Sequence, residues 1–303
     1  MTRLRLDKPY LLLLLTVLFW SGNWVVGRGL RGDVPPVALA FWRWTLAFAC
    51  TLPFAWPHRH QIGAALRSHL GMLLLLSLLG ISGYNTITYI GLQQTTATNG
   101  VLLNSFIPIV IIGLSWAFFG KRLSLREGFG ALISLCGVTV IVAHGDFAKL
   151  AALSLNPGDL WIMVSVFVWA GYTLLLQYRP AGLHPMAMLS ILTALGVLML
   201  APLYGWELAQ GRLIHPSAAA FAGILYTGVF PAFLGYVFWN RAVAQVGGPV
   251  SGLFIHLMPV FTPLLSALFL GEAPHAYHFA GMALILGGIL LTTLRRALKS
   301  TQT

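Results

Sequence analysis

The stretch FWSGNWVVGRGL occupies residues 19–30, and a related stretch, VWAGYTLLLQYR, occupies residues 168–179. Aligning the two places Trp20 on Trp169 at an offset of 149 residues, nearly half of the 303-residue chain. An average helix has about 11 residues, so an offset of this size relates groups of elements rather than neighbouring turns of one element. The two stretches therefore predict an architecture that is built twice.

The composition of the chain is that of a membrane protein. Hydrophobic residues make up 58% and charged residues 8%, whereas soluble domains are about 25% charged. Ten apolar stretches are each long enough, at about 20 residues, to cross a bilayer as a helix. They lie near residues 10–31, 35–56, 68–92, 97–119, 125–144, 157–178, 185–207, 218–241, 249–270 and 276–294. We therefore predict an all-α membrane protein with ten transmembrane helices in contact with the lipid bilayer.

Further matched residues extend the repeat along the chain. They are Pro36 with Pro185 and Pro53 with Pro202 at an offset of 149, then Pro108 with Pro259, Gly120 with Gly271, Gly130 with Gly281 and Gly137 with Gly288 at an offset of 151. Coincidence is the alternative, because Gly and Pro are frequent in membrane helices. Each copy contains five spans, so the second copy enters the membrane from the opposite side, as in many secondary transporters. We predict two inverted five-helix repeats, residues 1–150 and 151–303, that form one transport domain.

The distribution of Lys and Arg predicts the orientation of the chain. Thirteen of the 18 cations fall in the N-terminal tail, the even-numbered loops and the C-terminal tail, four fall near the odd-numbered loops, and Arg43 lies within a span. By the positive-inside rule, both termini face the cytoplasm. The net charge of +11 is spread over helix ends and forms no continuous basic face, so nucleic acid is not an expected partner. The apolar run from Tyr10 outlasts a normal signal peptide and is retained as the first helix.

The motifs together resemble the drug/metabolite transporter superfamily, EamA type, over essentially the whole chain. The resemblance rests on Phe41-Trp42-Arg43 after Pro36, on the Pro in the fourth and ninth spans, and on Leu270-Gly271-Glu272 followed by Gly281 and Gly287-Gly288. One departure is that Lys121-Arg122 stands where the second half has Glu272. The resemblance implies export of amino acids, other small metabolites or organic cations, and the aromatic content makes YddG-like aromatic amino-acid exporters the closest group.

Aromatic and amide side chains in the first and sixth spans are the first candidate substrate-binding residues. Trp20, Asn23 and Trp24 lie in the first span, and Trp169 and Tyr172 lie in the sixth. Trp and Tyr normally gather at the headgroup level, so copies several turns inside indicate walls that stack on an aromatic or amphipathic substrate. Plain helix packing is the alternative for each Trp. An amide such as that of Asn23 must find a partner across the bundle or line water.

The ionisable candidates Arg43 and His256 lie away from the ends of their predicted spans. Arg43 is about 12 Å into the second span, where a charge is costly unless it faces the interior. It could attract a substrate carboxylate or bind carbonyls at a neighbouring helix end, and we favour the second role. His256 lies in the ninth span and could be a proton site, because its ordinary pKa is near 6.5. A histidine satisfied by an interhelical hydrogen bond is the interpretation that we favour.

The remaining candidates are polar side chains and prolines of the other spans. Tyr84, Asn104 and Tyr236 are predicted to line the substrate pathway, with Asn85, Tyr89, Asn99, Trp239 and Asn240 as further polar or amphipathic groups nearby. Pro108 and Pro259 each remove a backbone hydrogen bond in mid-span and occupy matched positions in the two halves. We predict that these two prolines act as hinges.

The acidic residues bear on the energy source. All seven fall at predicted helix ends or in loops, whereas proton-coupled exporters commonly carry a carboxylate within the membrane. No Walker A motif, GxxxxGK[ST], occurs in the chain, so nothing in it predicts ATP-driven pumping. We expect an alternating-access exporter or facilitator of aromatic and other small neutral amino acids in the inner membrane. We expect it to be uncoupled or weakly proton-coupled, to work as a monomer and to need no metal or cofactor.

Other functions remain open at this stage. An organic-cation transporter or a nucleotide-sugar transporter would share the resemblance, but the second needs more cations in the cavity than Arg43. A channel would need no alternating access, and only a carrier performs counterflow. An intramembrane protease is the remote alternative, because Gly80-Ile81-Ser82-Gly83 matches a GxSG nucleophile pattern and His256 could nominally serve as its base. We predict that the protein is not an enzyme.

Overall fold

A computed structural model describes residues 9–30, 32–95, 100, 103–120, 124–143, 145–146, 148, 156–270 and 275–300. Every regular element in these ranges is a helix, which confirms the all-α prediction. Five helical stretches are long and apolar enough to cross a membrane, and several shorter helices are also apolar. The fold is therefore that of a multi-pass membrane protein.

The helices follow the predicted order. Those of the first half are α1 (Pro9–Leu30), α2 (Pro36–Ala55), the 3₁₀ turn η1 (Trp56–His58), α3 (Arg59–Ser77), the π-helical turn η2 (Leu78–Gly83), α4 (Tyr84–Gln94), α6 (Ile107–Phe119) and α7 (Leu125–Val142). Those of the second half are α9 (Pro157–Leu175), η3 (Leu176–Tyr178), α10 (Pro185–Ala209), α11 (Ala218–Thr227), the π-helical turn η4 (Gly228–Leu234), α12 (Gly235–Val246), α13 (Gly248–Leu253), the 3₁₀ turn η5 (Phe254–Leu257), α14 (Met258–Leu270) and α15 (Ala276–Ser300).

The ten predicted spans do not all appear as separate helices. Pro36–Gly91 forms one apolar helical stretch where the second and third spans were predicted. The connection at residues 56–67, expected as a loop, is helical, and the chain changes direction at His69, whose φ of −134° and ψ of 24° are not helical. Sequence hydropathy locates apolar segments but does not distinguish a helical connection from a coil, so the count of ten spans stays a prediction.

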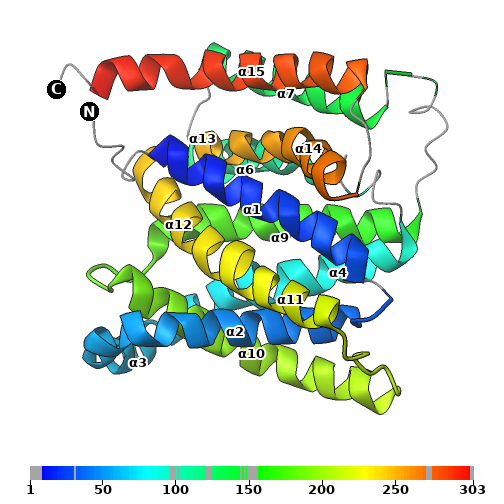
Figure 1. Ribbon diagram of the computed structural model, residues 1–303. Helices are drawn as coiled ribbons and strands as arrows, with labels where there is room; N and C mark the ends of the chain where they lie inside the picture. The colour runs from blue at the N-terminus through cyan, green and yellow to red at the C-terminus, as the bar shows by residue number, and fades with distance from the viewer. Residues whose placement is uncertain are drawn as a thin grey trace, which may run out of the picture.

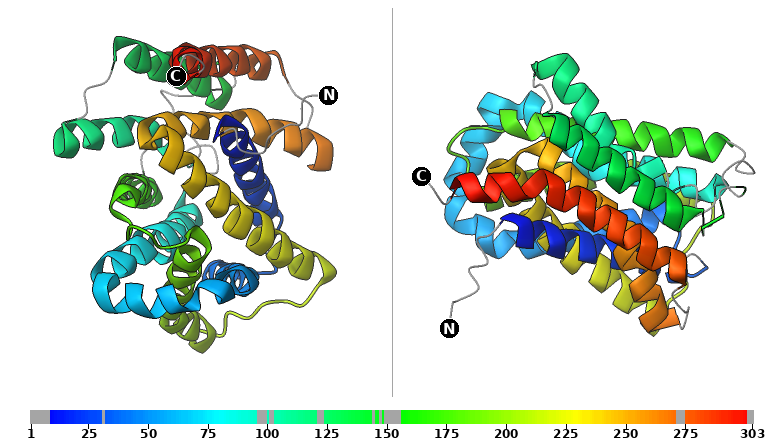
Figure 2. Two further views of the ribbon diagram at one scale, coloured as in Figure 1. Left: turned by 90° about the vertical axis from the view of Figure 1, so that its left-hand side faces the viewer. Right: turned by 90° about the horizontal axis from the view of Figure 1, so that it is seen from above.

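The helices are arranged in layers (Figure 1). α7 packs along α15 at one edge of the molecule, and α2 packs along α10 with α3 beside them at the opposite edge. α1, α4, α9 and α12 cross the space between these edges, and the same layering is visible in the left view of Figure 2. Large aromatic side chains are buried inside the molecule, including Trp44 of α2, Tyr172 of α9 and Trp239 of α12.

The edge formed by α7 and α15 depends on small residues at matched positions. A Cβ atom added to Gly137 would lie 2.6 Å from the carbonyl oxygen of Gly281, and one added to Gly288 would lie 2.4 Å from that of Gly130. The two contacts are related by the repeat, because Gly288 follows Gly137 by 151 residues and Gly130 precedes Gly281 by the same number. Such close approach of two backbones is what small residues allow in membrane helices.

A π-helical turn interrupts the third predicted span of each half. η2 separates α3 from α4, and η4 separates α11 from α12. Such turns disturb the regular backbone ladder and leave carbonyl groups open to other donors. The hydroxyl of Tyr236, from the second half, donates to the carbonyl oxygen of Gly80, and the indole N–H of Trp20, from the first half, donates to that of Pro231. Hydrogen bonds from aromatic side chains therefore connect each interrupted helix to the other half of the chain.

The two candidate hinge prolines lie beside breaks rather than inside continuous helices. Pro108 is the second residue of α6, after a turn at residues 105–106. Pro259 is the second residue of α14, directly after η5. Proline is well tolerated in a first helical turn, because the N–H that it lacks would have no partner there. The expected mid-helix kinks are therefore replaced by matched helix breaks, and the hinge role stays a prediction.

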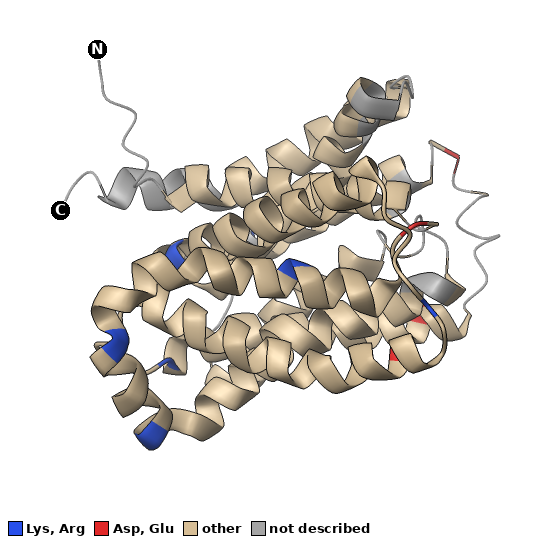
Figure 3. Cartoon of the chain, turned by 60° about the horizontal axis from the view of Figure 1, so that its bottom comes forward, with Lys and Arg blue, Asp and Glu red and all other residues tan. Residues whose placement is uncertain are grey.

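The charges of the described residues are separated along the helices (Figure 3). Asp and Glu gather at one end of the bundle, and most Lys and Arg lie toward the other end. This asymmetry agrees with the loop charges used above. The Lys121-Arg122 pair, the Gly271-Glu272 motif, Asn99, Lys149 and the cations of the N-terminal tail lie outside the described residues.

Candidate functional site

A cavity of about 40 Å³ lies between the two halves. It takes side chains from α1, α2, α4, α9 and α12 and from the broken spans that contain α6 and α14. The lining residues are Trp20, Asn23, Trp24, Arg43, Tyr84, Asn85, Asn104, Ile107, Trp169, Tyr236, Ile255 and Met258. One part of this wall is polar and cationic, and the rest is aromatic or aliphatic, so the cavity is suited to an amphipathic molecule.

The structure brings together eight of the ten predicted substrate-binding residues. They are Trp20, Asn23, Trp24, Arg43, Tyr84, Asn104, Trp169 and Tyr236. Tyr172 and His256 do not line the cavity. This agreement concerns position, and the role of these residues in binding stays a prediction.

Arg43 is the principal charged group of the cavity. Only 3% of its surface is exposed, and its Nη1 donates to the Tyr89 hydroxyl at 2.9 Å and to Asn85 Oδ1 at 3.3 Å. Its guanidinium lies 5.2 Å from the ring centre of Trp44, and its Nε has no hydrogen-bond partner. The carbonyl groups that we expected as partners are replaced by side chains of α4. These neutral partners hold the guanidinium in place and leave its positive charge uncompensated.

The buried carboxylates among the described residues bond to groups other than Arg43. Glu207 accepts hydrogen bonds from the backbone N–H groups of Ala38 at 2.6 Å and Val37 at 3.2 Å, at the start of α2. Asp159 accepts from the Thr95 hydroxyl and from the backbone N–H of Asn156. The Glu207 and Thr95 contacts join the first half to the second, whereas the Asn156 contact caps the start of α9 within the second half. The sequence placed both acids at helix ends but did not show which donors they accept hydrogen bonds from.

Asn23 contributes the second unsatisfied group of the cavity wall. Its Oδ1 is buried and has no hydrogen-bond partner. The other two cavity asparagines already have partners for their side-chain oxygens, because Asn85 Oδ1 accepts from Arg43 and Asn104 Oδ1 accepts from the Tyr84 hydroxyl at 3.1 Å. Asn23 therefore presents a free acceptor in the same cavity as the uncompensated cation.

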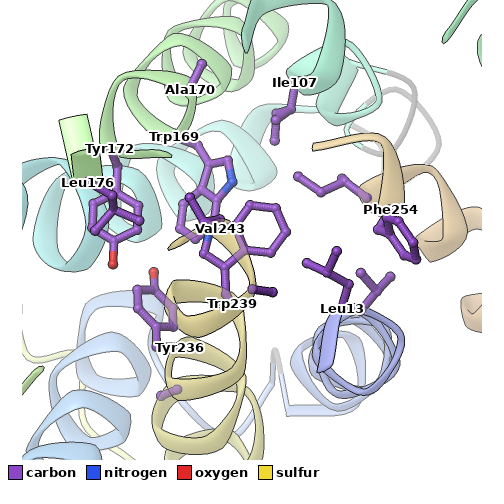
Figure 4. Packing of buried hydrophobic residues seen from close by; sticks show 14 of the residues in the cluster. Leu13, Ile107, Trp169, Ala170, Tyr172, Leu176, Tyr236, Trp239, Val243 and Phe254 are labelled. Carbon is purple, nitrogen blue, oxygen red and sulfur yellow. The ribbon is translucent and has the colours of Figure 1, made fainter. Parts of the chain in front are cut away.

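Aromatic rings from both halves form a continuous cluster beside the cavity. The ring centres of Trp20 and Trp169 lie 5.1 Å apart with an interplanar angle of 85°, and Trp20 is also 5.1 Å from Trp239. Tyr84 and Trp169 are 4.8 Å apart. Figure 4 shows Trp169, Trp239 and Tyr236 gathered where α9 faces α12. Edge-to-face and tilted pairs of this kind are favourable aromatic geometries, so the cluster forms a firm wall that extends into the cavity.

Tyr172 and His256 have structural partners instead of cavity positions. The Tyr172 hydroxyl donates to Asn240 Oδ1 at 2.8 Å, and its ring packs 5.2 Å from that of Trp169. His256 is fully buried, and its Nε2 donates to the carbonyl oxygen of Ser105 at 2.8 Å. This bond fixes the tautomer with the proton on Nε2 and ties η5 to the break before α6. His256 therefore makes an interhelical hydrogen bond through Nε2, while its buried Nδ1 has no hydrogen-bond partner. Tyr172 packs against Trp169 of the aromatic wall.

Four cavity residues were absent from the predicted set. Asn85 was noted as a further polar residue, and its position next to the predicted site residue Tyr84 was the signal that could have placed it in the cavity wall. Ile107, Ile255 and Met258 are apolar residues in apolar segments, where nothing in the sequence separates a cavity wall from a lipid-facing or packed position. Ile255 and Met258 flank His256, so the broken helical geometry of η5 turned the neighbours of the predicted residue toward the cavity.

A pair of histidines joins the halves at another place. The rings of His58 and His184 stack with centres 3.7 Å apart and an interplanar angle of 12°. The backbone N–H of His184 donates to Gln61 Oε1 at 2.9 Å, and His184 Nδ1 accepts from the backbone N–H of Met186 at 3.3 Å. Burial and the neighbouring His58 imidazole lower the pKa of His184 below its ordinary value. His184 lies directly before α10, and His58 lies in η1 between α2 and α3.

Comparison with known proteins gives a consistent result. The model of the EamA-like transporter family matches residues 7–143 and 156–294. An uncharacterized transporter of Archaeoglobus fulgidus is 28% identical over 299 residues, covering 96% of this chain and 99% of its own. The uncharacterized transporter YyaM of Bacillus subtilis is 24% identical over 281 residues, covering 93% and 92%. A probable terminal-alkyne amino-acid exporter of Streptantibioticus cattleyicolor is 26% identical over 293 residues, covering 96% and 95%.

A solved crystal structure is also similar to this chain. Its TM-score is 0.74 at 20% sequence identity, and the match covers 96% of this chain and 98% of that one. At this identity the likeness concerns the fold alone.

Proposed function

We propose that this chain, which belongs to the EamA-like transporter family, is an alternating-access exporter or facilitator of aromatic and other small neutral amino acids. The relatives described above are named as transporters, and one of them is described as a probable terminal-alkyne amino-acid exporter. The proposed site is the cavity between the two halves. The proposed setting is the inner membrane, with both termini in the cytoplasm.

The observation that carries this proposal is the state of Arg43. A buried guanidinium without a carboxylate partner costs several kcal/mol inside a membrane protein, and no described carboxylate compensates Arg43. A substrate that brings its own carboxylate would remove this cost, so the cavity favours an anionic group at that point. The aromatic wall offers stacking and burial to an apolar side chain. Together these features favour a molecule with a carboxylate at one end and an apolar or aromatic group at the other.

The small volume of the cavity supports a site that enlarges when the substrate binds. A volume of about 40 Å³ holds a few water molecules at most, whereas sites for small molecules start near 300 Å³. An amino acid therefore enters only when helices of the two halves separate. The reciprocal contacts of α7 with α15 and the matched breaks in the two halves support an inverted repeat, in which one half can exchange arrangements with the other.

Coupling to protons has little support in the described part of the chain. Asp159 and Glu207 are buried, but both satisfy helix ends and neither lines the cavity. His256 is bonded to Ser105 and is also away from the cavity wall. We therefore propose that transport is driven by the substrate gradient itself.

The other candidate functions fit the cavity less well. A site for organic cations would place the substrate charge beside Arg43, which repels it. A nucleotide sugar carries more than one phosphate charge, and Arg43 is the one cation among the lining residues. The protease hypothesis lacks its geometry, because the Ser82 hydroxyl donates to Met199 Sδ and His256 donates to Ser105.

A substrate panel tests the proposal. Purified protein in proteoliposomes is given labelled phenylalanine, labelled tetraphenylphosphonium or a labelled uridine diphosphate sugar, with protein-free liposomes as the control. We expect uptake of phenylalanine alone. Uptake of the phosphonium cation or the nucleotide sugar without phenylalanine would contradict the proposal and favour the corresponding alternative.

A further inference from the structure

We propose that the side-chain oxygen of Asn23 accepts the α-ammonium group of the substrate and thereby selects zwitterionic amino acids over simple carboxylates. This inference rests on the proposed function and assigns a specificity-determining residue within the same site. It starts from an inventory of the polar groups that face the cavity.

Most of these polar groups are already committed within the protein. The Tyr236 hydroxyl donates to Gly80, the Trp20 indole N–H donates to Pro231 at 3.0 Å, and the Tyr84 hydroxyl donates to Asn104. Asn85 is used on both sides, because its Oδ1 accepts from Arg43 and its Nδ2 donates to the carbonyl oxygen of Ile81 at 3.0 Å. A ligand that bonded to any of these groups would have to displace an existing partner.

Three buried atoms of the cavity residues lack any partner. Trp169 Nε1 is a neutral donor in the aromatic wall, and the other two atoms are complementary in kind. Arg43 Nε is a cationic donor, and Asn23 Oδ1 is a neutral acceptor. A buried group without a partner costs about 1–3 kcal/mol, so each is expected to serve a ligand. A ligand that satisfies both carries an anion and a donor close together. The carboxylate and the ammonium group on the α-carbon of an amino acid meet this requirement.

An amide at position 23 suits this role better than a carboxylate. A carboxylate in so small a cavity would pair with Arg43 and compete with the substrate for the guanidinium. The amide oxygen accepts hydrogen bonds from the ammonium group without adding a negative charge. An uncharged acceptor therefore preserves the anion site while it adds recognition of the amine.

The position of Asn23 on α1 also orients the substrate side chain. Trp20 lies three residues earlier, and residues three apart share a helix face. Trp20 packs edge-on against Trp169, so an amino acid with its ammonium group on Asn23 places its side chain next to these rings. The same helix thus presents the amine acceptor and the aromatic surface.

The unmodified protein gives the first test, because it needs no variant to fold. Exchange in proteoliposomes is measured for phenylalanine, for 3-phenylpropionate, which lacks the amine, and for phenethylamine, which lacks the carboxylate. We expect phenylalanine to be preferred over each analogue by roughly tenfold to 100-fold, the range for one hydrogen bond to a charged group. Equal transport of phenylalanine and 3-phenylpropionate would overturn the inference while leaving the Arg43 site intact.

Variants then assign the selectivity to Asn23. We expect Asn23→Leu, which is similar in size but has no acceptor, to bring the phenylalanine to 3-phenylpropionate ratio close to one. We expect the carboxylate introduced by Asn23→Asp to pair with Arg43 and to weaken exchange of both acids. Ser21→Ala on the same helix is the control, because the Ser21 hydroxyl bonds to Val17 and does not line the cavity. Its ratio should match the unmodified protein.

The outcomes separate this inference from the proposed function. If Asn23→Leu runs as a folded monodisperse protein and keeps the original ratio, Asn23 does not read the amine, although amino-acid transport stands. If the unmodified protein exchanges no amino acid at all, the proposed function fails and the inference fails with it.

Discussion

At the scale of single residues, the site depends on one uncompensated cation. Arg43 is held by two neutral side chains of α4, so its position is fixed while its charge stays available. Its neighbours offset part of the cost of burying the charge, because Asn85 and Tyr89 accept hydrogen bonds from Nη1 and the Trp44 ring lies close to the guanidinium. We propose that the substrate carboxylate binds to the donors of Arg43 that have no partner in the protein.

The first prediction concerns the removal of this charge. Arg43→Met should reduce amino-acid exchange by roughly 100-fold, because a carboxylate bonded to a charged donor loses up to about 3 kcal/mol when that donor is removed. Since no ion pair within the described protein is broken, the variant should still run as a folded monodisperse protein. Arg43→Lys should restore part of the activity. Undiminished exchange by Arg43→Met would rule out Arg43 as the carboxylate site.

Single residues also show how far the sequence predicted the site. Eight of the ten predicted residues line the cavity because aromatic, amide or cationic side chains deep in apolar segments are costly unless they face an interior. The same reasoning placed Tyr172 and His256 in the site, because the sequence does not show that Tyr172 bonds to Asn240 and that His256 bonds to Ser105. Those partners lie 68 and 151 residues away in the chain, so only the packed structure pairs them.

At the scale of helices, close packing of α7 with α15 is set by individual glycines. The neighbouring glycines 287 and 288 differ sharply in their surroundings. A Cβ atom at Gly288 would meet Ser134 Oγ at 2.3 Å and the Gly130 carbonyl oxygen at 2.4 Å, whereas a Cβ atom at Gly287 would meet nothing within 4 Å. The sequence pointed to Gly288 as part of the repeat, but only the structure shows which face of α15 is in contact.

The second prediction compares these two glycines. Gly288→Ala should force α7 and α15 apart and lower the melting temperature in detergent, because the added methyl group would overlap the backbone carbonyl oxygen of Gly130 in α7. Gly287→Ala should leave the melting temperature unchanged or raise it slightly, since alanine favours a helix by about 1 kcal/mol over glycine. Thermal unfolding followed by circular dichroism measures both. Equal effects of the two substitutions would contradict this packing.

The third prediction concerns the start of α10. The lowered pKa of His184 means that the folded protein binds its proton less readily than the unfolded chain, so this group favours folding more as pH rises. The stacking with His58 and the hydrogen bond from the backbone N–H of Met186 are fully formed above pH 6.5. They are lost as the pH falls through the lowered pKa of His184. Asn is a good cap that does not titrate, so His184→Asn should lose less thermal stability than the unmodified protein between pH 7.5 and pH 5. Parallel pH profiles for the two proteins would contradict this role.

At the scale of the whole molecule, the sequence predicted the membrane setting and the order of the helices. Low charge and regularly spaced apolar segments are properties of local composition, and they could be recognised without the structure. The joined stretch Pro36–Gly91, the breaks before Pro108 and Pro259, and the contacts of Glu207 and Asp159 depend on how distant helices meet. The predicted inverted repeat draws on both sources. Its offset of 149 to 151 residues is visible in the sequence, and reciprocal contacts such as those of α7 with α15 support it.

The central claim is that the two halves alternately expose one amino-acid site, and counterflow tests it most directly. Proteoliposomes loaded with unlabelled phenylalanine are diluted into labelled phenylalanine, with and without a pH gradient. We predict transient accumulation of the label above the external concentration, to the same extent in both conditions, because only a carrier exchanges one molecule for another. Absence of accumulation by folded protein would contradict the account. Accumulation that requires the pH gradient would contradict its uncoupled mechanism.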